Sequence, residues 1–205
     1  SFVTTSPSVL NFLPKDTNNF YIPNPSDDSF ETLNNFLKPC TVDVFFALSH
    51  GVHRGVLKSG KIDDRITFLK SLSEKTPDVK FDIYGIDKIQ PIWADHYFKT
   101  IANAKMGLNL SRGEAIKYYS SDRITQIVGN GLVCLIDEKT QYRDFFDNSE
   151  MVFYKNISDL SEKILKISRD EKLRKSIGKK GKKKYMKYFN STLVADFIIN
   201  KTLGR

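Results

Sequence analysis

The sequence predicts an α/β fold built on a parallel, doubly wound sheet. Two observations carry this prediction. Five short apolar runs, each the length of a buried strand, occur at residues 42–48, 80–84, 106–110, 132–136 and 151–154. Segments with apolar residues at helical spacing alternate with these runs along the chain. Strands that alternate with helices pair in parallel, because each helix carries the chain back to the start of the next strand.

The clearest strand–helix–strand unit spans residues 106–136. Its first strand, 106–110, leads into a polar loop, 111–119, which cannot belong to the core. Ser120 and Ser121 then offer helix N-caps. Apolar residues follow at helical spacing: Ile124, Ile127 and Val128. Two glycines, Gly129 and Gly131, end this helix before the strand at 132–136.

The other elements follow in order by the same reasoning. Strand 42–48 leads through a glycine-rich polar loop, 49–60, into an amphipathic helix over 62–72. Strand 80–84 precedes a helix that begins after Trp93, with four residues predicted to face inward: Tyr97, Phe98, Ile101 and Ala104. Three helices follow strand 151–154. Their predicted inward residues are Leu160, Ile164 and Ile167, then Leu173, Ile177, Tyr185 and Tyr188, then Ala195, Ile198 and Ile199.

The second of these three helices is strongly basic. Its nine cations are Lys172, Arg174, Lys175, Lys179, Lys180, Lys182, Lys183, Lys184 and Lys187. The remaining 23 basic residues nearly balance 24 acidic ones, so the net charge of +8 belongs to this helix. We expect its lysines to face solvent, and Gly178 and Gly181 to let it approach a neighbour closely. A solvated face is the simplest interpretation, and contact with anionic membrane lipid is an alternative. We do not expect nucleic acid as a partner, because the aromatic residues of the helix are predicted to face inward.

Composition indicates an ordinary globular chain. The 205 residues are 40% hydrophobic and 27% charged, and no apolar run approaches the ~20 residues of a membrane span. Cys40 and Cys134 make neither a disulfide framework nor a metal set, which favours a reduced, cytoplasmic protein. Residues 1–40 have breakers and little periodicity and are predicted to be a linker, 41–190 one domain, and 191–205 a C-terminal helix.

Loops that leave the carboxyl ends of the strands share one edge of the sheet, where open α/β sheets bind anionic ligands. The first loop offers His50, His53, Arg54 and Lys58. The loop and helix start after residue 110 offer Arg112, Lys117, Tyr118, Tyr119, Ser120, Ser121 and Arg123. Asp122 opposes anion binding there, unless it caps the helix or pairs with Arg123. The alternatives are that the cations are solvated, that Arg123 forms a structural ion pair, and that the tyrosines are core or lid residues.

Several segments, taken in order, resemble one family. They are Tyr-Ile-Pro-Asn-Pro at 21–25, a strand with a Gly/Arg/Lys loop at 45–58, the helix before Gly131, the acidic Asp137 after a strand, and the run 170–181. Together, residues 20–190 resemble the C-terminal, donor-binding domain of GT-B fold glycosyltransferases of the group 1 type, especially the CgeB-like group.

The resemblance implies a Rossmann-like domain at 41–190 that binds a nucleotide-diphosphate sugar. Residues 1–40 would then include the remnant of an N-terminal acceptor domain. The implied reaction is hexosyl transfer to a glycan, lipid or protein, as in polysaccharide biosynthesis, without a cofactor. No Asp-x-Asp pair occurs, so we expect no metal. A membrane-bound acceptor would place the protein at the inner face of the membrane, and the chain alone would turn over poorly.

One position departs from the family pattern. A glutamate usually stands five residues before the glycine that ends the central helix and binds the donor ribose, whereas this chain has Gln126. Glutamine keeps a hydrogen-bond donor and an acceptor but has no charge. The family's earlier glutamate corresponds to Tyr118, so Glu114, nearby but out of register, is the candidate catalytic carboxylate. A non-catalytic nucleotide-sugar or polyanion-binding module therefore stays an alternative.

Overall fold

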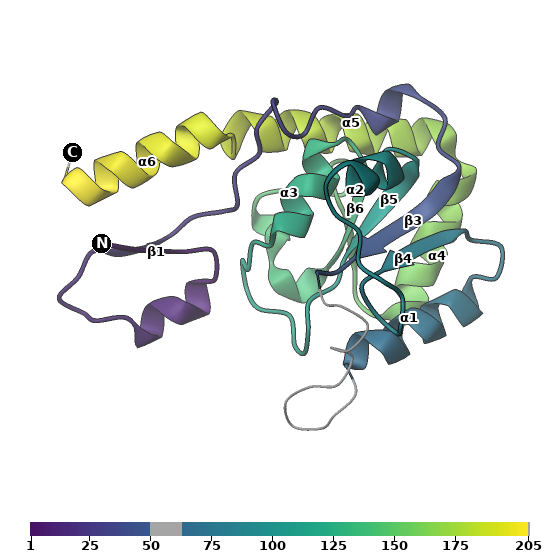
Figure 1. Cartoon of the computed structure of the whole chain (residues 1–205), viewed down its shortest axis with the longest axis horizontal. Helices are drawn as coiled ribbons and strands as arrows, with labels where there is room; N and C mark the ends of the chain where they lie inside the picture. The colour runs from purple at the N-terminus through teal and green to yellow at the C-terminus, as the bar shows by residue number, and fades with distance from the viewer. Residues whose placement is uncertain (50–62, 205) are drawn as a thin grey trace.

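A five-stranded parallel sheet forms the centre of the larger lobe (Figure 1). The computed structural model describes residues 1–49 and 63–204. In chain order the strands are β3 (Val42–Ala47), β4 (Phe81–Tyr84), β5 (Ala104–Asn109), β6 (Val133–Asp137) and β7 (Val152–Tyr154). Their order in space is β4-β3-β5-β6-β7, which confirms the predicted doubly wound sheet. The winding reverses at β3, because β4 lies on one side of it and β5 on the other.

Helices cover both faces of this sheet because its strands are apolar on both sides. α1 (Asp64–Lys75) and α4 (Ile157–Arg169) pack into one core cluster, and α2 (Ala94–Ile101) and α3 (Asp122–Gly129) into the other. α5 (Glu171–Tyr188) contributes Ile177 to the first cluster and Tyr185 to the second. Three short 3-10 helices complete this lobe: η2 (Asn35–Leu37), η3 (Glu138–Thr140) and η4 (Tyr142–Asp144).

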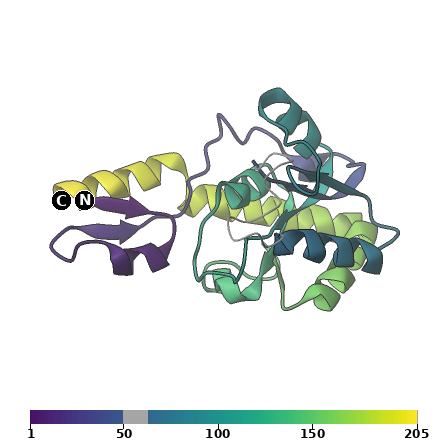
Figure 2. The same cartoon turned by 60° about the horizontal axis from the view of Figure 1, so that its bottom comes forward.

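The two ends of the chain together form a smaller lobe. β1 (Phe2–Thr4) and β2 (Asn19–Tyr21) pair in parallel around η1 (Pro7–Phe12), and α6 (Ser191–Leu203) packs against them. The rings of Phe20 and Phe197 meet edge to face at 5.6 Å, and the side chain of Asn18 donates to the carbonyl of Lys201. Figure 2 shows this lobe standing to one side of the sheet, with both termini at its far end.

Two segments run side by side between the lobes. The backbone N–H of Ser26 donates to the carbonyl of Phe189 at 2.8 Å, and that of Ser191 donates to the carbonyl of Ser26 at 2.9 Å. The side chain of Asn190 caps α6 by accepting from the N–H of Leu193. The polypeptide therefore crosses from one lobe to the other twice, at adjacent places.

The two glycines of α5 lie where the helix touches its neighbours, as predicted. A Cβ on Gly178 would stand 2.4 Å from the carbonyl oxygen of Gly131, and one on Gly181 would stand 2.4 Å from that of Glu150. Backbone atoms cannot withdraw as a flexible side chain can. Both positions therefore require glycine for the packing of α5.

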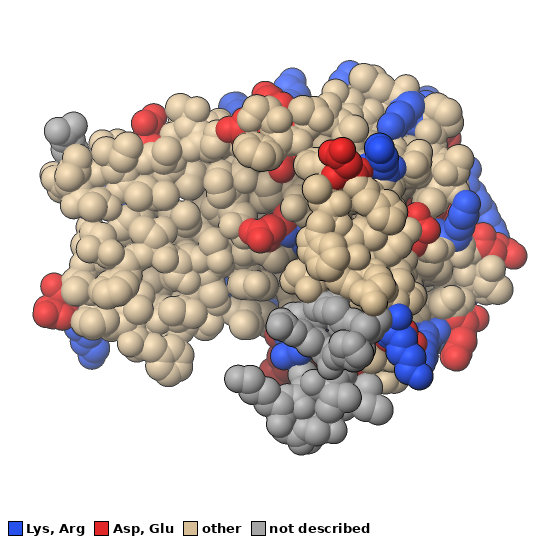
Figure 3. Space-filling view, in the orientation of Figure 1, with Lys and Arg blue, Asp and Glu red and all other residues tan. Residues whose placement is uncertain are grey.

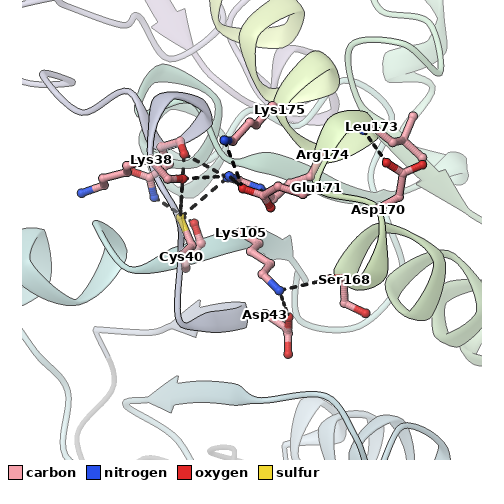
Figure 4. Close-up of polar contacts among 12 residues, drawn as sticks. Lys38, Cys40, Asp43, Lys105, Ser168, Asp170, Glu171, Leu173, Arg174 and Lys175 are labelled. Carbon is pink, nitrogen blue, oxygen red and sulfur yellow. Dashed lines mark hydrogen bonds and ion pairs between the residues drawn. The ribbon is translucent and has the colours of Figure 1, made fainter.

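The prediction that the lysines of α5 face solvent is wrong for Lys182, which is half-buried, and the one arginine of this helix, Arg174, is only 1% exposed. Its guanidinium pairs with Glu171 and donates to the carbonyls of Asn35 and Lys38, at 2.9 Å each (Figure 4). These two carbonyls precede β3, so Arg174 fixes the chain as it enters the sheet. The ammonium of Lys182 donates to two further carbonyls of the same segment, those of Glu31 and Leu33.

Four predictions of inward-facing residues were also wrong, and a fifth residue lies in another element. Ala104 is buried as predicted, but it is the first residue of β5 and does not belong to α2. Phe98 of α2 is 37% exposed. Tyr188 is 53% exposed at the end of α5, where the helix passes beyond the sheet. In α6 only Val194 is fully buried, while Ala195 and Ile199 are exposed, because the small lobe covers only part of that helix.

Candidate functional site

A cleft of about 620 Å³ opens at the carboxyl edge of the sheet, beside the segment that joins the two lobes. Its lining includes Ala47 and Leu48 at the end of β3, Trp93 before α2, and Asn24 from the joining segment. The N-terminus of α3 forms a further wall. This volume suits a small-molecule ligand, and the edge is where the winding of the sheet reverses.

Two arginines enter this cleft from equivalent positions. Arg65 is the second residue of α1 and Arg123 is the second residue of α3, and both residues line the cleft. The two helices follow β3 and β5, the strands on either side of the reversal. The same tetrapeptide, Asp-Arg-Ile-Thr, opens both helices, at residues 64–67 and 122–125. Because the two helices begin at the same edge of the sheet, the arginines of the two repeats lie in the same cleft.

Arg65 is held by a carboxylate. Its Nε lies 2.9 Å from Oδ1 of Asp63, and its Nη2 lies 2.6 Å from Oδ2. Both side chains are buried, and Asp63 also caps α1 by accepting from the N–H of Arg65. The hydrogen bonds from Arg65 lower the pKa of Asp63 to about 2. The geometry is the two-pronged one that favours an arginine–carboxylate pair.

Arg123 is held by neutral oxygens. Its guanidinium donates to the carbonyls of Ala47, at 3.3 Å, and Leu110, at 3.2 Å, and stacks 5.1 Å from the ring centre of Phe46. No Asp or Glu among the described residues forms an ion pair with it, and residues 50–62 contain neither amino acid. Burial, and secondarily the charge of Arg65, lower the pKa of Arg123 to about 10. Arg123 is therefore charged at neutral pH, with its charge not neutralised by a carboxylate of the described chain.

The two serines before α3 hold the loop. Ser121 occupies the N-cap position, as predicted, but its hydroxyl donates to Oδ1 of Asn109 at 2.9 Å and does not cap the helix. Ser120 is buried, and its hydroxyl accepts from the N–H of Asn24 at 2.8 Å. Within the described chain, no partner accepts from the N–H groups of Asp122 and Arg123. These first N–H groups of α3 are thus free for a ligand.

Gln126 lies one turn further along α3 and also lines the cleft. Its Oε1 accepts a hydrogen bond from the Tyr97 hydroxyl at 2.6 Å. Among the described residues, the amide nitrogen of Gln126 has no hydrogen-bond partner. Tyr119 and Trp93, which is 61% exposed, add aromatic surface to the same cleft.

Four other predicted residues lie outside the cleft lining. Arg112 is 46% exposed and 3.7 Å from the carboxylate of Asp63. Tyr118 points toward η4, where it donates to Asp144, and the ammonium of Lys117 lies 4.7 Å from the centre of its ring. Glu114 is exposed. The predictions for His50, His53, Arg54 and Lys58 fall outside the described residues.

Sequence reasoning missed Arg65, Trp93, Tyr97 and Asn24 as cleft residues. The repeated Asp-Arg-Ile-Thr could have identified Arg65, because both copies follow a predicted strand and its loop. Trp93 and Tyr97 were assigned to the start and inward face of a helix, with nothing to place them at the cleft. Asn24 carries no local signal, since it reaches the site only through the crossing of the two lobes.

The described residues contain neither a group of metal-ligating side chains nor a membrane-spanning helix. In residues 1–49 and 63–204, no three His, Cys, Asp or Glu side chains are grouped to hold a metal ion. Over the same residues, no helix has the length and apolarity needed to cross a bilayer.

Solved glycosyltransferase structures resemble this chain. TarM matches 98% of the chain and 43% of its own length, with 17% sequence identity and a TM-score of 0.67. Sucrose-phosphate synthase from Thermosynechococcus elongatus matches 97% of the chain and 56% of its own length, at 13% identity and a TM-score of 0.60. The pneumococcal O-GlcNAc transferase GtfA matches 89% of the chain and 39% of its own length, at 10% identity and a TM-score of 0.58. The chain thus spans about half the length of these proteins or less.

These likenesses confirm the predicted Rossmann-like fold of a GT-B glycosyltransferase. No curated protein matches the chain in sequence. A family described as glycosyl transferase-like matches residues 65–200, about two thirds of the chain. The match begins at Arg65 and includes all of α3, so it covers both arginines of the cleft. The chain belongs to this glycosyl transferase-like family.

Proposed function

We propose that the chain is the donor-binding half of a glycosyltransferase and that its cleft binds a nucleotide-diphosphate sugar. The observation that carries this proposal is Arg123, a charged guanidinium in the cleft with only neutral partners in the described chain. Such a cation favours an anionic ligand, since desolvating an unpaired charge is costly. A diphosphate has the negative charge to neutralise Arg123 and is small enough to bind in the cleft at the N-terminus of α3.

The proposed chemistry is departure of the nucleoside diphosphate from the sugar. Negative charge grows on the leaving phosphate, and fixed donors aimed at that charge lower the barrier. Arg123 and the free N–H groups of α3 are such donors, and Arg65 adds a second guanidinium held in place by Asp63. With these cations in place we propose that transfer of a hexose needs neither a metal nor a cofactor.

The other cleft residues have proposed supporting roles. The amide nitrogen of Gln126 would contact the ribose, and Tyr119 or Trp93 would pack against the base or the sugar. Support for this ligand class comes from relatives: one TarM variant of S. aureus was solved with UDP, and GtfA with UDP and GlcNAc. Glu114 stays a prediction for the catalytic carboxylate.

The acceptor is proposed to be a glycan, a lipid or a protein. The structures that resemble this chain are longer, so residues that bind the acceptor would lie partly outside it. We therefore expect the isolated chain to bind nucleotide but to transfer sugar poorly. A cytoplasmic location, close to the inner face of a membrane, fits a membrane-bound acceptor and is proposed with it.

Calorimetric titration with UDP, GDP, ADP and CMP, with magnesium and with EDTA, tests the donor site. We expect one diphosphate to bind in both conditions and Arg123→Gln to weaken its binding about 10- to 100-fold, through loss of charge-assisted hydrogen bonds. The matched control is Arg169→Gln, because Arg169 is 69% exposed on α4 and should leave affinity unchanged. Failure of all four nucleotides to bind, or equal loss in both variants, would overturn the proposal.

A non-catalytic nucleotide-sugar-binding protein is the second candidate. It is favoured by Gln126, which carries no charge and whose carbonyl is engaged by Tyr97. The two candidates differ when donor and acceptor are supplied to the complete protein. Release of nucleoside diphosphate supports the enzyme, and tight binding without release supports the second candidate.

A further inference from the structure

Five lysines of α5 form a straight row along the outer side of the helix. They are Lys172, Lys179, Lys180, Lys183 and Lys187, and all five are exposed. At 100° per residue, their directions fall within an arc of about 100°, opposite the buried face that carries Gly178 and Gly181. From the first to the last lysine the row extends roughly 22 Å, at 1.5 Å per residue. We call this set the lysine row.

The lysine row lacks carboxylate partners. Among the described residues, none of its five ammonium groups forms an ion pair. Of the acidic residues near α5, Glu171 pairs with Arg174 and Lys175, and Glu150 pairs with Lys184. Asp147 is close enough to Lys180 to feel its charge: hydrogen bonds from Ser149, and to a smaller degree the charges of Lys184 and Lys180, lower the pKa of Asp147. Several blue side chains lie along the upper edge of Figure 3, where Figure 1 draws α5, with a few red ones among them. The row is therefore a local excess of positive charge on a chain that is otherwise nearly neutral.

We propose that the lysine row docks the protein onto an anionic lipid surface. A single exposed helix face, straight over about four turns, can lie along a flat surface so that all five ammonium groups reach it together. Lysine suits this contact, because it is a hydrated point charge that does not need a shaped partner. Each lysine near an anionic bilayer strengthens binding by roughly fivefold.

The observations favour a bilayer over a nucleic acid. The one arginine of α5, Arg174, is buried, so this face offers no arginine, the residue that pairs with phosphate in a fixed two-pronged geometry. No exposed aromatic side chain stands between its lysines to stack on a base, because Tyr185 is buried. Tyr188 follows the row, and the centre of its ring lies 4.9 Å from the ammonium of Lys187. The excess of basic over acidic residues is also confined to one helix, whereas nucleic-acid-binding domains carry a wider basic face.

Co-sedimentation of the chain with vesicles tests this proposal. One set of vesicles is pure phosphatidylcholine, and the other contains equal parts of phosphatidylcholine and phosphatidylglycerol. We expect binding to the anionic vesicles alone, weakening as salt is raised. Replacing all five lysines of the row by glutamine should lower the partition coefficient about a hundredfold or more.

The matched control removes the same charge from exposed lysines elsewhere. Its five substitutions to glutamine are at Lys15, Lys75, Lys80, Lys99 and Lys139. This control should keep most of the vesicle binding, and circular dichroism and thermal unfolding should show both variants folded. Similar losses in the two variants would mean that net charge, and not the row, drives binding.

A second measurement separates the bilayer from other polyanions. A fluorescent single-stranded oligonucleotide is titrated in the same buffer, and also added as a competitor of the anionic vesicles. We expect weak oligonucleotide binding and little displacement. The proposal is overturned if the chain ignores anionic vesicles, or if the oligonucleotide binds more tightly and removes the chain from them.

Discussion

Arg65 and Arg123 hold the same position in two helices, but only Arg65 has a carboxylate partner. Asp63 grips Arg65 with both oxygens, whereas Arg123 rests on backbone carbonyls and the amide oxygen of Asn109. One arginine is therefore part of the framework of the cleft, and the other is free to neutralise a ligand. This difference separates the effects of the two residues on stability and on binding.

Arg65→Gln should destabilise the protein strongly. It would leave the carboxylate of Asp63, 1% exposed, with only the more distant guanidinium of Arg112 at 3.7 Å, and breaking a buried pair from one side costs about 3–5 kcal/mol. Arg123→Gln removes no partner of a buried carboxylate, so its cost in unfolding free energy should be smaller. Urea denaturation of the two variants measures the contrast. The double variant Arg65→Gln/Asp63→Asn should recover part of the loss, and equal costs for the two single variants would contradict this account.

The pKa of Asp63 should be near 2, well below the usual carboxyl value, because Arg65 hydrogen-bonds to its ionised form. A lowered pKa means that this carboxylate stabilises the folded state above the unfolded pKa of about 3.9 and loses that effect as the pH falls toward 2. A carbon-13 NMR titration of the carboxyl group measures it directly. In Arg65→Gln the pKa should rise, and an unchanged value would show that Arg65 is not the cause.

The five strands were predictable because each lies in a short, largely apolar run, which is the pattern of buried parallel strands. The site was less predictable. Arg123 and Gln126 stand on a periodic helix that the sequence places after a strand, so their position followed from the pattern. Tyr118 could not be excluded from the cleft, because its direction depends on its positive φ of 56° and on Asp144, twenty-six residues away in sequence.

Long-range contacts explain the remaining differences. In the sequence, Arg174 is one more cation of a basic helix. No residue close to it in sequence indicates that its guanidinium binds the carbonyls of Asn35 and Lys38 and is buried there. The small lobe joins residues from both ends of the chain, so neither segment alone has the apolar period of a domain. Such pairings leave no local sequence signal. The glycines of α5 are a local signal, because only glycine lets the helix come so close to the neighbouring backbone.

Gly181→Ala should destabilise the protein although alanine is the better helix former. The new Cβ would stand 2.4 Å from the carbonyl oxygen of Glu150, so α5 or the segment before β7 must move. We expect a net loss of about 1–3 kcal/mol, the usual range for overpacking, after a propensity gain of roughly 1 kcal/mol. Thermal and urea unfolding measure it. Ser176→Ala, at an exposed position of the same helix, is the control and should change stability by less than about 0.5 kcal/mol. A neutral Gly181→Ala would show that α5 can shift freely.

Ser120→Ala should weaken the joint between the lobes more than it weakens nucleotide binding. The Ser120 hydroxyl accepts from the backbone of Asn24, whose carbonyl in turn accepts from Tyr185 at 2.8 Å and Thr125 at 3.0 Å. Removing the hydroxyl leaves the part-buried N–H of Asn24 without its acceptor, at a cost of up to about 1–3 kcal/mol in unfolding free energy.

Ser121→Ala is the matched control for this change. Among the described residues the Ser121 hydroxyl forms a hydrogen bond only with Asn109, and its loss should cost less, about 0.5–1.5 kcal/mol. Amide hydrogen exchange near residues 22–27 should speed up in Ser120→Ala and not in Ser121→Ala. Calorimetric titration should show a smaller loss of affinity than in Arg123→Gln. If Ser120→Ala lost nucleotide binding while keeping its stability, its hydroxyl would contact the ligand and not the joint.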